Sequence, residues 1–121
     1  MMAFDPAVTA LSALAHPGRL GIFRLLVKAG PRGLSAGDIA KAMDSLPNTL
    51  SNNLNILSSA GLVRSRREGR SVIYTAAYDR MRDLLAFLID DCCGGDASIC
   101  APLADLMKQP ACCVAEVEEP A

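Results

Sequence analysis

Residues 47–76 read PNTLSNNLNILSSAGLVRSRREGRSVIYTA, and this stretch carries the clearest signals from which the fold of the chain can be predicted. Pro47 suits the first turn of a helix and Gly61 suits the position after its last turn, so the spacing predicts one helix between them. At 100° per residue, one side of that helix is apolar. The residues on this side are Leu50, Leu54 and Leu57. The stretch therefore begins with an amphipathic helix whose leucine side packs inward.

The polar side of this helix carries side chains that favour hydrogen bonding over helix stability. Asparagine and serine are weaker helix formers than glutamate, lysine or alanine, so local stability does not account for them. Asparagine can form a paired contact with adenine in the major groove, and serine can bind a base edge or a phosphate. An ordinary solvated surface is the alternative. The residues predicted to contact DNA are Asn48, Thr49, Ser51, Asn52, Asn53 and Asn55.

A basic hairpin follows the helix directly. Two predicted strands, Leu62–Arg66 and Ser71–Thr75, flank a turn at residues 67–70 that contains Gly69. A basic β-ribbon can track phosphates or enter the neighbouring minor groove, with an affinity that salt weakens. A solvated run of charges is the other interpretation. The arginines expected to contact DNA phosphates are Arg64, Arg66, Arg67 and Arg70.

Four further helices are predicted, over residues 5–15, 16–30, 35–43 and 79–93. Asp5 is the expected cap of the first helix, because a proline follows it at the first helical position. Ser35 is the expected cap of the helix over residues 35–43. The order is helix, helix, short helix, helix, hairpin, helix. It predicts a mainly α protein with a small β-hairpin, which is a winged helix-turn-helix.

Length and charge favour a single nucleic-acid-binding domain in the cytoplasm. The 121 residues fit one domain, predicted over residues 1–93, with a loosely ordered cysteine-containing tail over 94–121. Residues 1–89 carry 11 Lys and Arg against 6 Asp and Glu, whereas residues 90–121 carry one Lys against seven acids. Phosphate attraction depends on the local face, so a basic body suits DNA. No apolar run is long enough for a membrane span and no signal pattern is present, so we expect a cytoplasmic protein without a membrane partner.

Three segments of the sequence resemble the ArsR/SmtB family of bacterial metal-responsive repressors. They are SALAHPGRLGIFRLLV (12–27), TLSNNLNILSSAGLV (49–63) and REGRSVIYTA (67–76), and the resemblance covers residues 9–93. It implies a homodimer joined through the first and last helices, bound to an imperfect operator palindrome and released by an inducer. Asn53 departs from the pattern, because members commonly carry His there, which puts an exact transfer of base contacts in doubt.

The cysteines indicate the inducer. All five lie in residues 92–113, and the segment DDCCGGDASIC (90–100) resembles the arsenic-responsive subgroup with a vicinal pair after the last helix and a third Cys nearby. The resemblance implies that Cys92, Cys93 and Cys100 bind As(III) as inducer, with Sb(III) as a second candidate. Soft thiolates suit such ions, and Gly94 and Gly95 would let the chain fold back. No organic cofactor is expected.

Several alternatives stay open at this stage. Cys112 and Cys113 are auxiliary ligands or bystanders, and five thiols could also build a four-ligand zinc or cadmium site. Cys92 continues an apolar helical stripe and could be a buried hydrophobe. Vicinal thiols also suit a redox or persulfide switch on the same scaffold. An enzyme is not expected, because the chain has no Cys-x-x-Cys motif and no paired base. His16 is interpreted as a helix-start residue.

Overall fold

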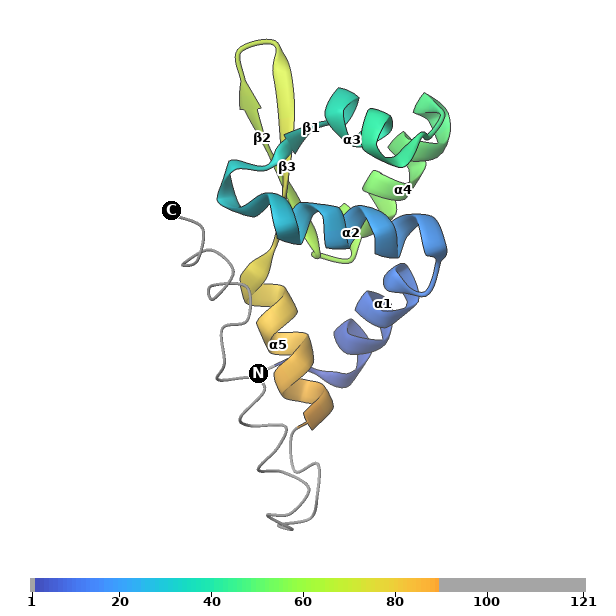
Figure 1. The fold of residues 1–121 in the computed structure, drawn as a ribbon. Helices are drawn as coiled ribbons and strands as arrows, with labels where there is room; N and C mark the ends of the chain where they lie inside the picture. Colours follow the sequence, from blue (N-terminus) through green and yellow to red (C-terminus); the bar gives the residue numbers. More distant parts are fainter. Residues whose placement is uncertain (1, 90–121) are drawn as a thin grey trace, which may run out of the picture. The chain divides into compact units, whose positions relative to one another are not determined.

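The computed structural model describes residues 2–89, and the first of its two compact units comprises residues 1–87. The elements in chain order are α1 (Phe4–Leu14), α2 (Pro17–Ala29), the short 3-10 helix η1 (Gly30–Arg32), β1 (Leu34–Ser35), α3 (Ala36–Met43), α4 (Pro47–Ser59), β2 (Val63–Glu68), β3 (Ser71–Ala76) and α5 (Tyr78–Ile89). Figure 1 shows α2 crossing the middle of the first unit, with α3, α4 and the hairpin on one side and α1 and α5 on the other. The predicted tail, residues 94–121, lies outside the described residues.

The start of α2 is the one that the sequence predicts. The Nδ1 atom of His16 accepts hydrogen bonds from the backbone N–H groups of Gly18, at 3.1 Å, and Arg19, at 3.4 Å. These bonds satisfy two donors that the first turn of a helix otherwise leaves unpaired. The interpretation of His16 as a helix-start residue is therefore confirmed, and this ring nitrogen is an acceptor in the fold.

The start of α1 corrects a prediction. The helix begins at Phe4, with Ala3 as the cap residue and no side-chain cap, whereas Asp5 was expected to be the cap. Asp5 instead lies inside the first turn, where its carboxylate still interacts favourably with the positive end of the helix dipole. The acidic residue marks the correct helix end, but the chain enters the helix two residues earlier.

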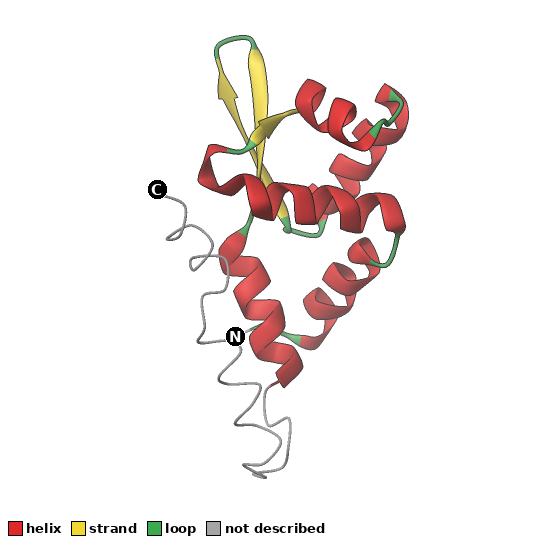
Figure 2. Ribbon diagram, in the orientation of Figure 1, coloured by secondary structure: helices red, strands yellow, loops and turns green. Residues whose placement is uncertain are grey.

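The sheet contains one strand more than the predicted hairpin. Its order is β1-β3-β2 with antiparallel pairing throughout, and β1 joins β3 through the pairs Leu34↔Tyr74 and Ser35↔Ile73. Two residues are too few to show the alternation by which a strand is recognised, so the sequence predicts no strand there. The winged helix-turn-helix class is confirmed, with small strands among helices as Figure 2 shows.

The core forms where α2 meets the elements on both of its sides. Its largest fully buried side chains are Ile22, Leu26, Ile39, Leu57 and Leu62. The first turn of α5 is tied to α2 by Tyr78, whose hydroxyl donates to the carbonyl oxygen of Val27 at 3.0 Å. Within residues 2–89, no helix has the length and apolar character needed to cross a membrane.

Candidate nucleic-acid interface

The amphipathic character of α4 is as predicted. Leu50, Leu54 and Leu57 are buried. Pro47 occupies the first turn, where its missing N–H costs no hydrogen bond. The predicted DNA-contacting residues that are exposed on this helix are Asn48, Thr49, Ser51, Asn52 and Asn55. A polar face of α4 is thus exposed on the described part of the chain.

Asn53 does not belong to this exposed face. Its exposed fraction is 6%, and it is the buried polar residue among the described ones. A Cβ atom added at Gly18 would lie 3.1 Å from the Asn53 Nδ2 atom, so Asn53 packs against the start of α2. The expectation of a DNA contact from this residue is therefore corrected. The signal lay in the sequence, because Asn53 follows Leu50 by three residues and precedes Leu57 by four, which places it on the buried stripe.

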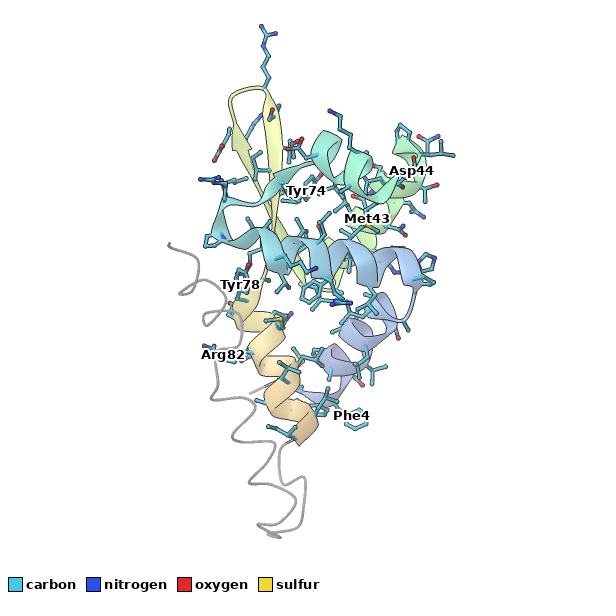
Figure 3. All side chains as sticks on the ribbon, in the orientation of Figure 1. Phe4, Met43, Asp44, Tyr74, Tyr78 and Arg82 are labelled. Carbon is cyan, nitrogen blue, oxygen red and sulfur yellow. The ribbon has the colours of Figure 1, made fainter. Side chains whose placement is uncertain are left out.

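The turn between α3 and α4 sets the angle of the second helix. Ser35 caps α3 as expected, because its Oγ accepts a hydrogen bond from the backbone N–H of Asp38 at 3.1 Å. The helix ends at Asp44, which adopts the left-handed conformation with φ 52°. Aspartate tolerates this conformation better than most residues. The short helix, sharp turn and second helix form a helix-turn-helix, and Figure 3 labels Asp44 at the turn.

The hairpin forms the wing, and its strands are longer than predicted. β2 and β3 pair over six residues each, from Val63↔Ala76 to Glu68↔Ser71. The connecting turn is therefore reduced to two residues, Gly69 and Arg70, and Gly69 has the positive φ of 64° that such turns require. Arg67 and Glu68 belong to β2 rather than to the turn.

Two of the four predicted arginines are engaged within the protein. Arg64 forms an ion pair with Asp79 at the start of α5, with Nη1 2.9 Å from Oδ1. The hydrogen bond from Arg64 holds the pKa of the Asp79 carboxyl below its ordinary value. Arg66 lies 2.7 Å from a carboxylate oxygen of Glu68, and it also donates to two backbone carbonyls. The sequence gives no signal for the Arg64–Asp79 pair, because the two residues are 15 positions apart.

The other two arginines are available. Arg67 and Arg70 are exposed, and neither forms an ion pair with any residue of the described part of the chain. Both lie at the outer end of the wing, on the side of α2 that also carries α4. The first unit therefore exposes a polar helix face and two guanidinium groups that form no ion pair among the described residues, and side chains of these kinds can contact bases and phosphates.

The predicted metal ligands cannot be placed. Cys92, Cys93, Cys100, Cys112 and Cys113 all lie outside the described residues. Among residues 2–89, no three His, Cys, Asp or Glu side chains gather in a way that could hold a metal ion. Metal binding by the cysteines beyond residue 89 thus stays a prediction.

A row of exposed apolar side chains on α1 is a second candidate surface. Phe4, Val8 and Leu11 are spaced by four and three residues, which places them on one side of the helix. Their exposed fractions are 69%, 47% and 40%. Phe4 contacts Phe87 of α5 edge to face, with the ring centroids 5.8 Å apart, and yet it is the most exposed of the three. Figure 3 labels Phe4.

Comparisons with known proteins agree with this architecture. The family model described as a helix-turn-helix domain matches residues 14–66. The biofilm growth-associated repressor of Agrobacterium fabrum is 33% identical over 79% of this chain and 74% of its own length. The transcriptional repressor SmtB homolog of Synechocystis is 38% identical over 65% of this chain and 58% of its own. The chain spans 62% of the length of an uncharacterized HTH-type transcriptional regulator from Mycobacterium tuberculosis, at 39% identity over 60% of this chain.

A solved structure gives the same assignment. The homodimeric winged helix-turn-helix DNA-binding domain from Mycobacterium bovis, described as "a possible ArsR-family transcriptional regulator", is 34% identical. The alignment covers 72% of this chain and 81% of that one, with a TM-score of 0.59. These relatives are transcriptional regulators and not enzymes. The chain belongs to the ArsR/SmtB family of winged-helix transcriptional regulators.

Proposed function

We propose that this protein is a dimeric transcriptional repressor that binds an operator palindrome and leaves it when trivalent arsenic binds Cys92, Cys93 and Cys100. The observation that carries the DNA-binding part is the joint exposure of the α4 polar face and the two unpaired wing arginines, Arg67 and Arg70. α4 would lie in the major groove and read bases with its asparagines, while the wing would contact flanking phosphates.

The α1 surface supports a dimer. A single copy leaves Phe4, Val8 and Leu11 in water, and a second copy would bury them. The Mycobacterium bovis relative is homodimeric, and a two-fold axis would present two copies of α4 to successive major grooves. The palindrome then follows from the symmetry of the protein, because each half-site would meet one copy of α4.

The chemistry of the thiols supports the inducer. Three thiolates match the preference of As(III) and Sb(III) for sulfur, and the vicinal pair is followed by two glycines that allow the chain to turn. The ligands follow α5 in the sequence, so binding would reorganise the end of that helix and change the spacing of the two α4 helices. A coupling of about 1–3 kcal/mol would lower operator affinity roughly 5–150-fold.

A redox or persulfide switch on the same scaffold is the second candidate. Both vicinal pairs, Cys92-Cys93 and Cys112-Cys113, favour it, because neighbouring thiols can be oxidised reversibly. The two candidates differ in what releases the DNA, namely a thiophilic ion in one and an oxidant in the other.

DNA binding is tested by fluorescence anisotropy of the reduced protein on DNA from its own upstream region. We expect tight binding, and Asn52→Ala should lower affinity by roughly 5–150-fold, because one paired base contact contributes about 1–3 kcal/mol. Arg82→Ala is the matched control, because Arg82 is an exposed α5 residue whose charge lies away from the wing. Equal affinity for upstream and scrambled DNA would contradict the proposal.

A further inference from the structure

We propose that Arg66 is a positioning residue of the wing, and that only Arg67 and Arg70 carry the wing's phosphate contacts. The assignment of phosphate contacts to Arg67 and Arg70 rests on the proposed DNA-binding function. The attachment of the wing to the body through Arg66 concerns the free protein alone. The four arginines of the hairpin therefore divide into two groups with different tasks.

Arg66 uses all three nitrogens of its guanidinium group to join distant parts of the chain. Its Nη1 donates to the carbonyl oxygen of Pro31 at 3.1 Å and its Nη2 to that of Arg32 at 2.8 Å. Its Nε donates to a carboxylate oxygen of Glu68 at 2.7 Å. Three nitrogens thus meet three acceptors, which suits the rigid fork of arginine and not the single ammonium of lysine. The two carbonyls belong to η1, more than 30 residues away in the sequence.

The Arg66 hydrogen bonds lie at the point along the wing where its pairing with β1 ends. β1 supports β3 only at Tyr74 and Ile73, so the outer part of the hairpin has no third strand beside it. Arg66 pairs with Ile73 across the hairpin, at the boundary of that unsupported part. Figure 1 shows the hairpin projecting beyond the other elements of the first unit. The Arg66 hydrogen bonds are therefore the outermost attachment of the wing to the body that the described residues provide.

The alternation of the strand separates Arg66 from Arg67. Successive side chains of β2 point to opposite faces, so Arg64, Arg66 and Glu68 share one face. Arg67 lies on the other face, which also carries Tyr74, because residues opposite each other in the register share a face. Tyr74 borders a pocket whose other walls come from α3 and α4, and Figure 3 shows it between the hairpin and α3. Arg67 therefore lies on the face of the wing that looks toward the helix-turn-helix.

Charge compensation separates the same residues. Arg64 is paired with Asp79 and Arg66 with Glu68, so the positive charges on that face are balanced within the protein. Three of the five N–H donors of Arg66 are already engaged, two of them with η1, so Arg66 has fewer donors to offer a phosphate than an unpaired guanidinium. Arg67 and Arg70 have no ion pair to break within the described residues, so they would release counterions from DNA without an internal cost.

The salt dependence of operator affinity tests this division, with Arg66→Ala and Arg67→Ala compared at several salt concentrations. Arg67→Ala should reduce the slope of log K against log[salt] by about one, because one phosphate contact is lost. Arg66→Ala should lower affinity while leaving that slope unchanged. Arg67→Lys should restore binding, whereas Arg66→Lys should not, because an ammonium group cannot replace the fork.

Amide hydrogen exchange of the free protein gives a readout that does not depend on DNA. Arg66→Ala should speed exchange in residues 66–73, and Arg67→Ala should leave it unchanged. A slope reduced by about one in Arg66→Ala, or unaltered exchange in its wing, would overturn the inference. If the wild-type protein does not bind DNA at all, the proposed function fails, and the exchange experiment still decides whether Arg66 holds the wing.

Discussion

Asn52 and Asn53 are identical neighbours with opposite environments. Asn52 is exposed on α4, whereas Asn53 is buried against the start of α2, near Gly18. A step of about 100° around the helix separates a side chain that can reach a base from one that fixes the helix in the body. Substitution of the two residues should therefore have different consequences, for DNA affinity at Asn52 and for the packing of α4 at Asn53.

Two glycines near the wing differ in what surrounds them, and substitution by alanine tests this difference. Gly30 begins η1 and Gly33 follows it, with φ values of 75° and 72°. A Cβ atom at Gly33 would lie 2.5 Å from the carbonyl oxygen of Tyr74, whereas one at Gly30 would meet nothing within 4 Å. Gly30→Ala should cost about 1–3 kcal/mol of unfolding free energy through its backbone angles alone.

Gly33→Ala should cost about 2 kcal/mol more than its control, because the backbone of β3 must also move. Urea denaturation of both variants measures the difference in the free energy of unfolding. Equal losses of unfolding free energy in the two variants would contradict the close approach of Gly33 to the carbonyl oxygen of Tyr74.

At the scale of elements, α1 separates its small and large apolar residues. Ala7, Ala10 and Ala13 are buried against the body, where their small size allows close approach. The larger Phe4, Val8 and Leu11 stay exposed. An element that places alanines inside and bulky side chains outside is typical of a helix with a second partner surface.

Leu11→Asp should convert the dimer to a monomer. A symmetric interface contains the residue twice, and each buried leucine contributes about 1.5–3 kcal/mol, so the dimer dissociation constant should rise by roughly 100-fold or more. Sedimentation velocity measures the change. Ala42→Asp on α3 is the control for added charge, because Ala42 is exposed on an element away from α1. A Leu11→Asp protein that stays dimeric would place the interface elsewhere.

The wing shows which parts of an element the sequence could predict. The β-branched and aromatic residues of the second strand and Gly69 indicated the hairpin and its turn, because these signals are local. β1 has no such signal, since its two residues form a strand only through their pairing with β3. The partners of Arg64 and Arg66 come from distant segments of the chain, so the sequence does not reveal them. The sequence therefore predicted the same phosphate-contacting role for all four arginines of the hairpin.

For the molecule as a whole, helix caps and leucine spacing were enough to predict the fold. Ser35, Pro47 and Gly61 marked helix ends where the structure has them. The exposed polar face of α4 was predictable in outline, with the buried Asn53 as the exception. The arsenic site stays a prediction from Cys92, Cys93 and Cys100, because the described residues end before them.

Arsenite titration of the reduced protein bound to its upstream DNA, followed by fluorescence anisotropy, tests whether trivalent arsenic is the inducer. We expect release from the wild-type protein and from a Cys112→Ser/Cys113→Ser control. We expect no release from a Cys92→Ser/Cys93→Ser/Cys100→Ser variant that still binds DNA with wild-type affinity. Release of that triple variant by arsenite, or a wild-type complex that only an oxidant dissociates, would contradict arsenic sensing at these cysteines.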